Sequence, residues 1–236
     1  MTDRLRLACV QVCAGNDLMA NLEAAASLAR AARNDGANFI AFPECVSMIE
    51  MGREAVLAKA APEEIHSGLS GFTDLARELD VWLLGGTLSV KLDEDRVANR
   101  SYLLDPSGEL RARYDKIHMF DVDLEDGESY RESATYRPGE ASSLVETPWG
   151  KLGMTVCYDL RFPHLYRDLA KAGAVLLSVP SAFTRPTGRA HWEILLRARA
   201  IENGAFVFAP AQCGEHPRGR LTYGHSMIID PWGEIL

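Results

Sequence analysis

The segment LGMTVCYDLRFP, residues 152–163, joins a predicted strand to a predicted helix. Residues 152–156 form a short apolar run that is typical of a buried strand, and residues 163–172 predict the helix. Cys157 lies in the turn between them. A cysteine there can expose its sulfur above the sheet while nearby backbone N–H groups face a substrate oxygen, which suits a nucleophile. Free cysteines are also among the most buried residues, so this segment alone leaves a structural role for Cys157 open.

Short apolar runs alternate with helical stretches in both directions from this segment. Before it, strands are predicted at residues 7–12, 38–42, 81–85, 99–104 and 109–114, and helices at 17–34 and 72–79. After it, strands are predicted at residues 175–179, 205–209 and 226–229, and a helix at 190–203. The sequence DPSG at residues 105–108 predicts a hairpin turn. This mixture predicts an α/β layered fold with a largely buried sheet.

Bulk properties exclude several classes of protein. The chain has 236 residues with no linker-like segment, so one domain over residues 1–236 is expected. The 25 basic and 33 acidic side chains give a net charge of −8, which argues against nucleic-acid binding. No stretch has the apolar length of a signal peptide or a bilayer span, so a cytoplasmic protein without membrane contact is expected. Five scattered cysteines indicate free thiols, and their spacing does not predict a zinc site.

A thiol becomes strongly nucleophilic only after it loses its proton, so Cys157 needs a base. Histidine is one type of candidate, and four are available: His118, His164, His191 and His225. Glu44 is the other candidate, because it follows the predicted strand at residues 38–42, at the edge where open α/β sheets bind ligands. Partial burial there would raise the pKa of its carboxyl toward the range useful for a base. A solvated loop glutamate is the simpler interpretation of Glu44 alone.

Lys116 is a third candidate for the site. It lies in YDKIHMF, residues 114–120, among apolar and aromatic neighbours. Its positive charge could stabilise the oxyanion of a tetrahedral intermediate. Taken alone, Lys116 is as well explained as a surface lysine paired with Asp115.

Together, these three segments resemble the carbon–nitrogen hydrolase (nitrilase-like) family. The matching motifs are FPE at residues 42–44, YDKIH at 114–118 and GMTVCYDLRFP at 153–163. They occur in the family's order, and the resemblance runs from the first predicted strand to the last residues. Three motifs in order are more specific than any one of them, so they favour catalytic roles for Glu44, Lys116 and Cys157.

The resemblance implies a mechanism that needs no metal or organic cofactor. Cys157 would attack an amide carbon to form a thioester, and Glu44 would carry the protons. Lys116 and the backbone N–H of Tyr158 would hold the oxyanion. Relatives often carry a second glutamate before a Pro-Gly pair, which assigns that role to Glu132 here, with Glu128 as the neighbouring alternative.

The resemblance also implies an architecture. The expected fold is a four-layer αββα sandwich, with mixed β-sheets flanked by helices, and the expected assembly is a homodimer or a higher homo-oligomer. Relatives usually continue beyond the turn at residues 230–234. A chain that ends at Leu236 is therefore expected to lack the usual C-terminal tail.

Residues after Cys157 resemble the branch of deaminated glutathione amidases and ω-amidases. The motifs are PSAF at 180–183, AHWE at 190–193 and AQCG at 211–214. Substrates of both groups are small anionic amides, so Arg185 and Arg189, in a predicted loop, are candidates to bind the carboxylate and Phe183 is a candidate apolar wall.

The expected activity is hydrolysis of a linear amide bond of the non-peptide type, with deaminated glutathione as the preferred substrate. The alternatives are an ω-amidase acting on α-ketoglutaramate-like dicarboxylate monoamides, another amidase or a nitrilase, and a catalytically silent scaffold.

Overall fold

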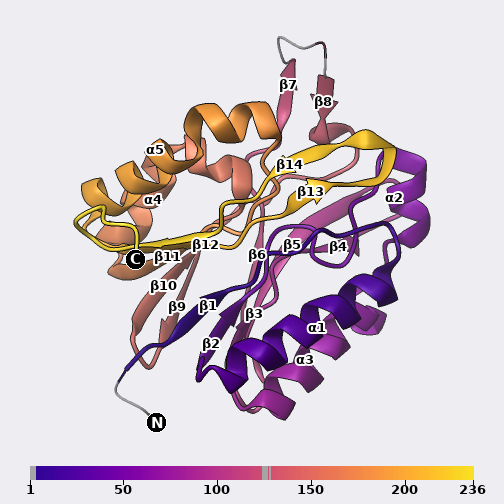
Figure 1. Cartoon of the computed structure of the whole chain (residues 1–236). Helices are drawn as coiled ribbons and strands as arrows, with labels where there is room; N and C mark the ends of the chain where they lie inside the picture. Colours follow the sequence, from indigo (N-terminus) through magenta and orange to yellow (C-terminus); the bar gives the residue numbers. More distant parts are fainter. Residues whose placement is uncertain (1–3, 124–126, 128) are drawn as a thin grey trace.

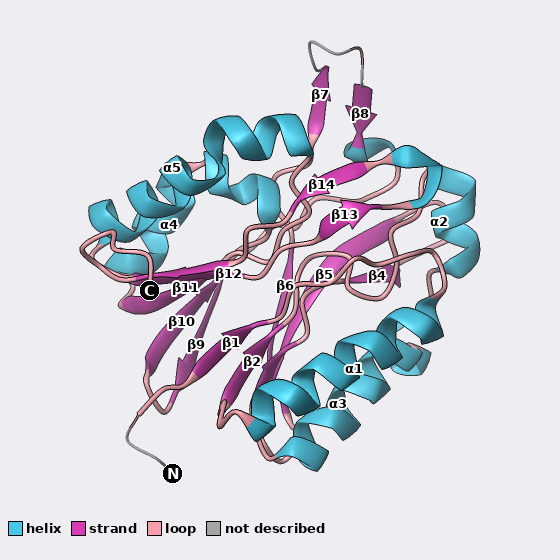
Figure 2. Cartoon of the chain, viewed as in Figure 1, coloured by secondary structure: helices cyan, strands magenta, loops and turns pink. Residues whose placement is uncertain are grey.

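The computed structural model describes residues 4–123, 127 and 129–236. Figures 1 and 2 show two β-sheets between helices that cover their outer sides. The layers follow the order helix, sheet, sheet, helix. This is the αββα sandwich that the resemblance implied, and the expected fold class is confirmed.

The first sheet belongs to the N-terminal half of the chain. Its strands are β1 (Leu7–Cys9), β2 (Phe39–Ala41), β3 (Trp82–Leu84), β4 (Leu88–Lys91), β5 (Val97–Leu104) and β6 (Leu110–Asp115). The order is β1-β2-β3-β5-β4, with β6 also paired to β5. The first three strands are parallel, and every pair that involves β5 is antiparallel. Helices α1 (Leu18–Asn34) and α3 (Ser67–Leu79) cover its outer face (Figure 1).

The second sheet has the order β15-β12-β11-β10-β9. Its strands are β9 (Ser143–Thr147), β10 (Gly150–Met154), β11 (Ala174–Ser178), β12 (Phe206–Ala209) and β15 (Met227–Ile229). The three central strands are parallel, and the two edge strands are antiparallel to them. Helices α4 (Pro163–Lys171) and α5 (Arg185–Asn203) cover it. Within the described part of the chain, no helix combines the length and apolar character needed to cross a membrane.

The strand β2 shows why the buried strands are apolar without interruption. Phe39 and Ala41 face the second sheet, whereas Ile40 faces the layer of α1 and α3. The ring of Phe39 packs edge-on against Phe208 of β12, with 5.5 Å between the ring centroids. Because both faces of the strand are covered, each side chain is apolar, as expected for a central parallel strand.

Short elements complete the end of the sandwich to which the parallel strands point. They are α2 (Arg53–Lys59), β7 (Asp121–Asp123), β8 (Ser129–Arg131), β13 (Cys213–Glu215), β14 (Leu221–Tyr223) and the 3-10 helices η1 (Glu63–Ile65), η2 (Glu132–Ala134), η3 (Cys157–Arg161) and η4 (Pro217–Gly219). Figure 1 shows β7–β8 and β13–β14 as hairpins near one another at this end. The sequence did not predict α2 or these hairpins.

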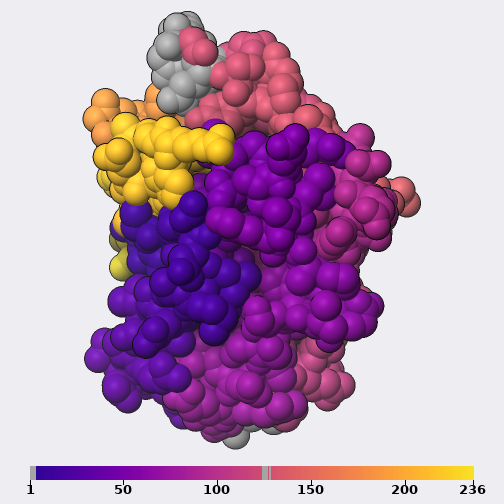
Figure 3. Space-filling view, turned by 90° about the vertical axis from the view of Figure 1, so that its right-hand side faces the viewer, coloured from indigo at the N-terminus to yellow at the C-terminus, as the bar shows by residue number. Residues whose placement is uncertain are grey.

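The segment that follows the N-terminal strand contacts the β13–β14 hairpin and the residue before it. After β1 the chain leaves the first sheet, so the predicted strand at residues 7–12 is shorter than expected, and Val12 instead bridges to Gln212. A ring nitrogen of His216 lies 2.8 Å from the Ala14 carbonyl oxygen. Figure 3 shows this face of the molecule, with the yellow C-terminal residues against the indigo N-terminal ones. These contacts hold the β13–β14 hairpin against the segment that follows β1, and Gln212 Nε2 also donates to the carbonyls of Glu44 and Cys45 in the loop that follows β2.

Candidate active site

Cys157 lies just beyond β10, at the first position of η3. Its φ is +49°, in the left-handed region that residues other than glycine rarely adopt. The Cys157 N–H donates to the Pro180 carbonyl across 3.0 Å, which holds the turn against the loop after β11. Strained backbone of this kind persists only where surrounding contacts enforce it, and it is frequent at functional sites.

The Asp159 carboxylate stabilises this turn through hydrogen bonds to residues on both sides of it in space. One carboxylate oxygen accepts the Val156 N–H at 2.9 Å and the Tyr114 hydroxyl at 2.7 Å. The other accepts the His118 N–H at 3.0 Å. Asp159 is fully buried. It therefore ties the cysteine turn to β6 and to the segment just after it, which carries Lys116.

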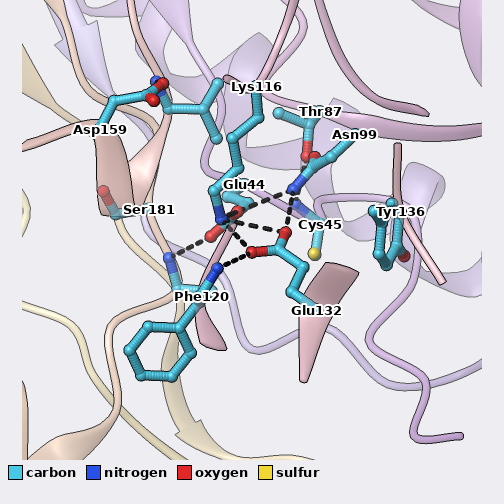
Figure 4. A network of polar contacts seen from close by, with 12 residues as sticks. Glu44, Cys45, Thr87, Asn99, Lys116, Phe120, Glu132, Tyr136, Asp159 and Ser181 are labelled. Atoms are coloured by element: carbon cyan, nitrogen blue, oxygen red, sulfur yellow. Dashed lines mark hydrogen bonds and ion pairs between the residues drawn. The ribbon is translucent and has the colours of Figure 1, made fainter. Parts of the chain in front are cut away.

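Glu44 and Lys116 lie side by side inside the protein (Figure 4). One Glu44 oxygen accepts from Lys116 Nζ and from Asn99 Nδ2, each at 2.9 Å. The other accepts the Ala182 N–H at 3.0 Å. Lys116 is only 2% exposed, so its interpretation as a surface lysine is wrong, and Asp115 pairs with Arg100 instead.

Glu132 completes the cluster from η2. Its two oxygens lie 3.0 and 2.8 Å from Lys116 Nζ, and one of them also accepts the Phe120 N–H at 2.7 Å. Asn99 Nδ2 donates to Glu132 at 3.2 Å and so spans the two carboxylates. The alternative candidate, Glu128, lies outside the described residues. Sequence reasoning missed Asn99, because Arg100 and Ser101 follow it in β5 and its polarity alone does not distinguish it.

The three central groups shift one another's pKa values. Burial raises the pKa of the Cys157 thiol well above its usual value, and the Glu44 charge adds to this effect while Lys116 opposes it. Burial also acts to raise the pKa of Glu44, but the Lys116 charge and hydrogen bonds from Cys157 and Lys116 outweigh it, so that pKa is lowered. The expectation of a raised Glu44 pKa was therefore wrong in sign.

The pKa of Lys116 is also set by burial and by neighbouring charges. Burial acts to lower its pKa, but the charges of Glu132 and Glu44 reverse this and raise the pKa well above its usual value. At neutral pH the cluster therefore holds a protonated thiol, an ionised Glu44 and a charged Lys116. A carboxylate base thus lies in contact with a proton-bearing nucleophile.

A cavity of about 330 Å³ opens onto this cluster. Six of the predicted site residues line it: Glu44, Lys116, Glu132, Cys157, Tyr158 and Phe183. The structure thus brings together side chains from segments that are far apart in the sequence. No histidine is among the described residues that line the cavity. The ring of His118 instead stacks on Phe162 and contacts Asp159, so a Cys–His pair is not the arrangement of this site.

Arg185 and Arg189 do not line the cavity, which corrects the expectation for both. The helix expected at residues 190–203 begins at Arg185, because the Thr184 side chain caps it by accepting the Thr187 N–H. Both arginines therefore lie exposed on the first turns of α5. Other arginines line the cavity, namely Arg53, Arg131, Arg161 and Arg220.

A family model described as carbon-nitrogen hydrolase matches residues 6–236. The chain belongs to the carbon–nitrogen hydrolase family. It is accordingly a hydrolase of carbon–nitrogen bonds, as the three motifs had indicated. In this family member the glutamate, lysine and cysteine motifs meet at one wall of one cavity.

Known relatives agree with this membership. A protein of Yersinia enterocolitica named deaminated glutathione amidase is 54% identical over 166 residues, which cover 69% of this chain and 58% of that protein. A Synechocystis protein of the same name is 40% identical over 233 residues, covering 97% of this chain and 85% of its own length. The crystal structure of the Caenorhabditis elegans NitFhit protein superposes with a TM-score of 0.88 at 38% identity, covering 97% of this chain and 56% of that one.

Proposed function

We propose that this carbon–nitrogen hydrolase is a cysteine amidase that cleaves a carboxylate-bearing linear amide, with deaminated glutathione as the preferred substrate. The observation that carries the proposal is the contact between three complementary groups at the cavity wall. The Cys157 thiol interacts with the Glu44 carboxylate, which is bound to Lys116 at 2.9 Å. Nucleophile, base and positive charge are the three parts that amide hydrolysis through a thioester requires.

The first half-reaction follows from the resting protonation states. As the sulfur of Cys157 attacks the amide carbon, its proton passes to Glu44. The carbonyl oxygen becomes an oxyanion held by Lys116 Nζ and the Tyr158 N–H. When this intermediate collapses, the carbon–nitrogen bond breaks, and the leaving amine takes the proton from Glu44. An acyl group then remains on Cys157 as a thioester.

The second half-reaction returns the enzyme to its starting state. A water molecule gives a proton to Glu44 and attacks the thioester carbon. The same two donors stabilise the second oxyanion. The carbon–sulfur bond then breaks, the carboxylic acid leaves, and Cys157 regains its proton. Glu132 has a positioning role in this scheme, because it holds Lys116 and receives the Phe120 N–H.

Two observations support an anionic substrate. The relatives of Yersinia enterocolitica and Synechocystis carry the name deaminated glutathione amidase. The cavity is also lined by four arginines, and two of them, Arg161 and Arg220, form no salt bridge with the described residues. Positive charge in an enclosed site favours a ligand that carries a carboxylate.

An assay of amine and ammonia release tests the proposal. The panel is deaminated glutathione, α-ketoglutaramate, a neutral aliphatic amide and a simple nitrile, with kcat/KM measured for each. The highest value is expected for deaminated glutathione, and none is expected with Cys157→Ser, whereas the matched variant Cys213→Ser retains activity. A preference for the neutral amide or the nitrile would refute the substrate assignment. If α-ketoglutaramate is best, the protein is an ω-amidase. A folded protein that is inactive on every compound would instead favour an unusual amide substrate or a silent scaffold.

We also propose that the protein is a cytoplasmic homodimer assembled through the α5 layer. The five cysteines are free thiols, which supports a reducing compartment. On α5, Ile194 is 70% exposed and Ile201 is 55% exposed. Large apolar side chains that cluster on an outer helix are typical of a surface covered by a partner.

A further inference from the structure

Arg220 reaches the catalytic cavity from a segment outside the three family motifs. It lies between η4 and β14 and lines the cavity with Glu44 and Cys157. Its position is fixed by the hairpin that carries it. The His216 N–H donates to the Arg220 carbonyl at 2.8 Å, and the Tyr223 N–H donates to the Phe183 carbonyl at 3.0 Å.

The guanidinium of Arg220 has an acceptor for Nη2 but none for Nε among the described residues. Its Nη2 donates to the Ala182 carbonyl at 3.0 Å, and its Cζ lies 5.6 Å from the ring centroid of Tyr130. Nε is buried and has no hydrogen-bond partner among the described residues. Buried donors are almost always paired in folded proteins, so the unpaired Nε–H leaves Arg220, a residue of the cavity lining, with a donor that the described residues do not use.

The other arginines of the cavity are already engaged. Arg53 binds Asp95 and Arg131 binds Asp123, at 2.7 and 2.8 Å. Arg161 stacks on the rings of Tyr158 and Phe183, each 5.7 Å away, and its Nη2 lies 3.3 Å from a ring nitrogen of His191. Arg220 therefore combines an enclosed position, an unpaired donor and the lack of a carboxylate partner among the described residues.

We propose that Arg220 is the specificity-determining residue that binds a carboxylate of the substrate, an inference that rests on the proposed amidase function. A guanidinium can bind a carboxylate through two parallel hydrogen bonds, and the Nε–H is one of the two donors on its side edge. The carboxylate belongs to the acyl part or to the amine part of the substrate. Matched substrates distinguish these two sources.

The experiment compares two pairs of amides. Glutaramate against pentanamide tests a carboxylate on the acyl part, and N-butyrylglycine against N-ethylbutyramide tests one on the amine part. For each pair the measured quantity is the ratio of kcat/KM for the charged amide to that for the neutral amide. Wild type is compared with Arg220→Gln, Arg220→Lys and the control Arg218→Gln, which alters an exposed arginine of the same hairpin outside the cavity lining.

Arg220→Gln is expected to lower this ratio about 10- to 100-fold for one pair, the range for loss of a charge-assisted hydrogen bond. Arg220→Lys is expected to recover part of it, and Arg218→Gln to keep the wild-type ratio. An unchanged ratio with both amides slowed alike would overturn the proposal, because Arg220 would then act only through Ala182 or Glu44. Arg161→Gln is assayed alongside these variants, and a selective loss in Arg161→Gln and not in Arg220→Gln would overturn the proposal as well.

The proposed function and this inference fail in different ways. If the wild-type protein hydrolyses no amide, the proposed function fails before any variant is compared. Calorimetric titration with glutarate then tests Arg220 alone. Binding to wild type that weakens at least about tenfold in Arg220→Gln supports the carboxylate site. Equal affinity of the two proteins, or no binding to either, rejects it.

Discussion

Glu44 Oε1 and Lys116 Nζ lie 2.9 Å apart although the two residues are 72 positions apart in the sequence. Both side chains are nearly inaccessible to water, at 5% and 2% exposure. Such a pair is stable only if its other hydrogen-bonding positions are filled. Asn99, Ala182 and Glu132 fill them, so the cluster is a closed network in which each member depends on the others.

Replacing Glu44 by Gln keeps the shape of this network and removes the base. The expected result is a fall in kcat of about 10²- to 10⁴-fold, the usual contribution of general acid–base catalysis. Steady-state assays on the best amide substrate measure it. Glu50→Gln, a carboxylate of the same cavity that is paired with Lys59, is the matched control. Equal losses in both variants would show that Glu44 is not the base.

Replacing Lys116 by Met should damage both catalysis and stability. Loss of an oxyanion donor lowers kcat about 10²- to 10³-fold. Removing one partner of a buried ion pair also leaves Glu44 and Glu132 without their cation, which costs about 3–5 kcal/mol of unfolding free energy. Urea denaturation and kcat measured on the same preparation check both effects. A stable variant with normal kcat would contradict the oxyanion role.

Replacing Cys157 by Ala should abolish turnover and leave the fold intact. The thiol contributes the nucleophile, whereas the turn is held by backbone contacts to Pro180 and by Asp159. Amine release should fall to the background level, with a thermal midpoint within a few degrees of wild type. Cys213→Ala outside the cavity serves as the control. Residual turnover well above background would mean that another group attacks the amide.

The lowered pKa of Glu44 predicts how its contribution to stability changes in acid. The unfolded chain binds a proton near the ordinary value of 4.5, and the folded protein binds it only at lower pH. Stability from the Glu44 charge is thus fully present above about 4.5 and is lost as pH falls through the folded value. The difference in unfolding free energy between wild type and Glu44→Gln should shrink below that pH. Denaturation curves over a pH series measure it, and a difference that grows in acid would contradict the assigned direction.

The proposed dimer gives a prediction with an internal control. Ile194→Glu places a charge on the exposed face of α5 and should convert a dimer to a monomer in analytical ultracentrifugation. Leu28→Glu, on the exposed side of α1 in the opposite layer, should leave the dimer intact. A wild-type protein that sediments as a monomer, or loss of the dimer in Leu28→Glu alone, would refute an interface on α5.

The sequence predicted the central strands and the meeting of three motifs, because those depend on local apolar runs and on resemblance. It misplaced Arg185 and Arg189 because the start of α5 was set too late. Thr184 followed by Pro186 is a helix-start signal that could have corrected this. The sign of the Glu44 pKa shift was beyond local reasoning, since it depends on Lys116, which follows β6 and is far from Glu44 in the sequence. Arg220 was missed for the same reason, because only the folded hairpin brings it to the cavity.

One residue, Ala182, contacts both the catalytic base and the arginine proposed to bind the substrate. The Ala182 N–H donates to Glu44, and the carbonyl of the same residue accepts from Arg220, whose charge helps to keep the pKa of Glu44 low. Because both hydrogen bonds end on Ala182, a shift of this residue would displace the base and the arginine at the same time.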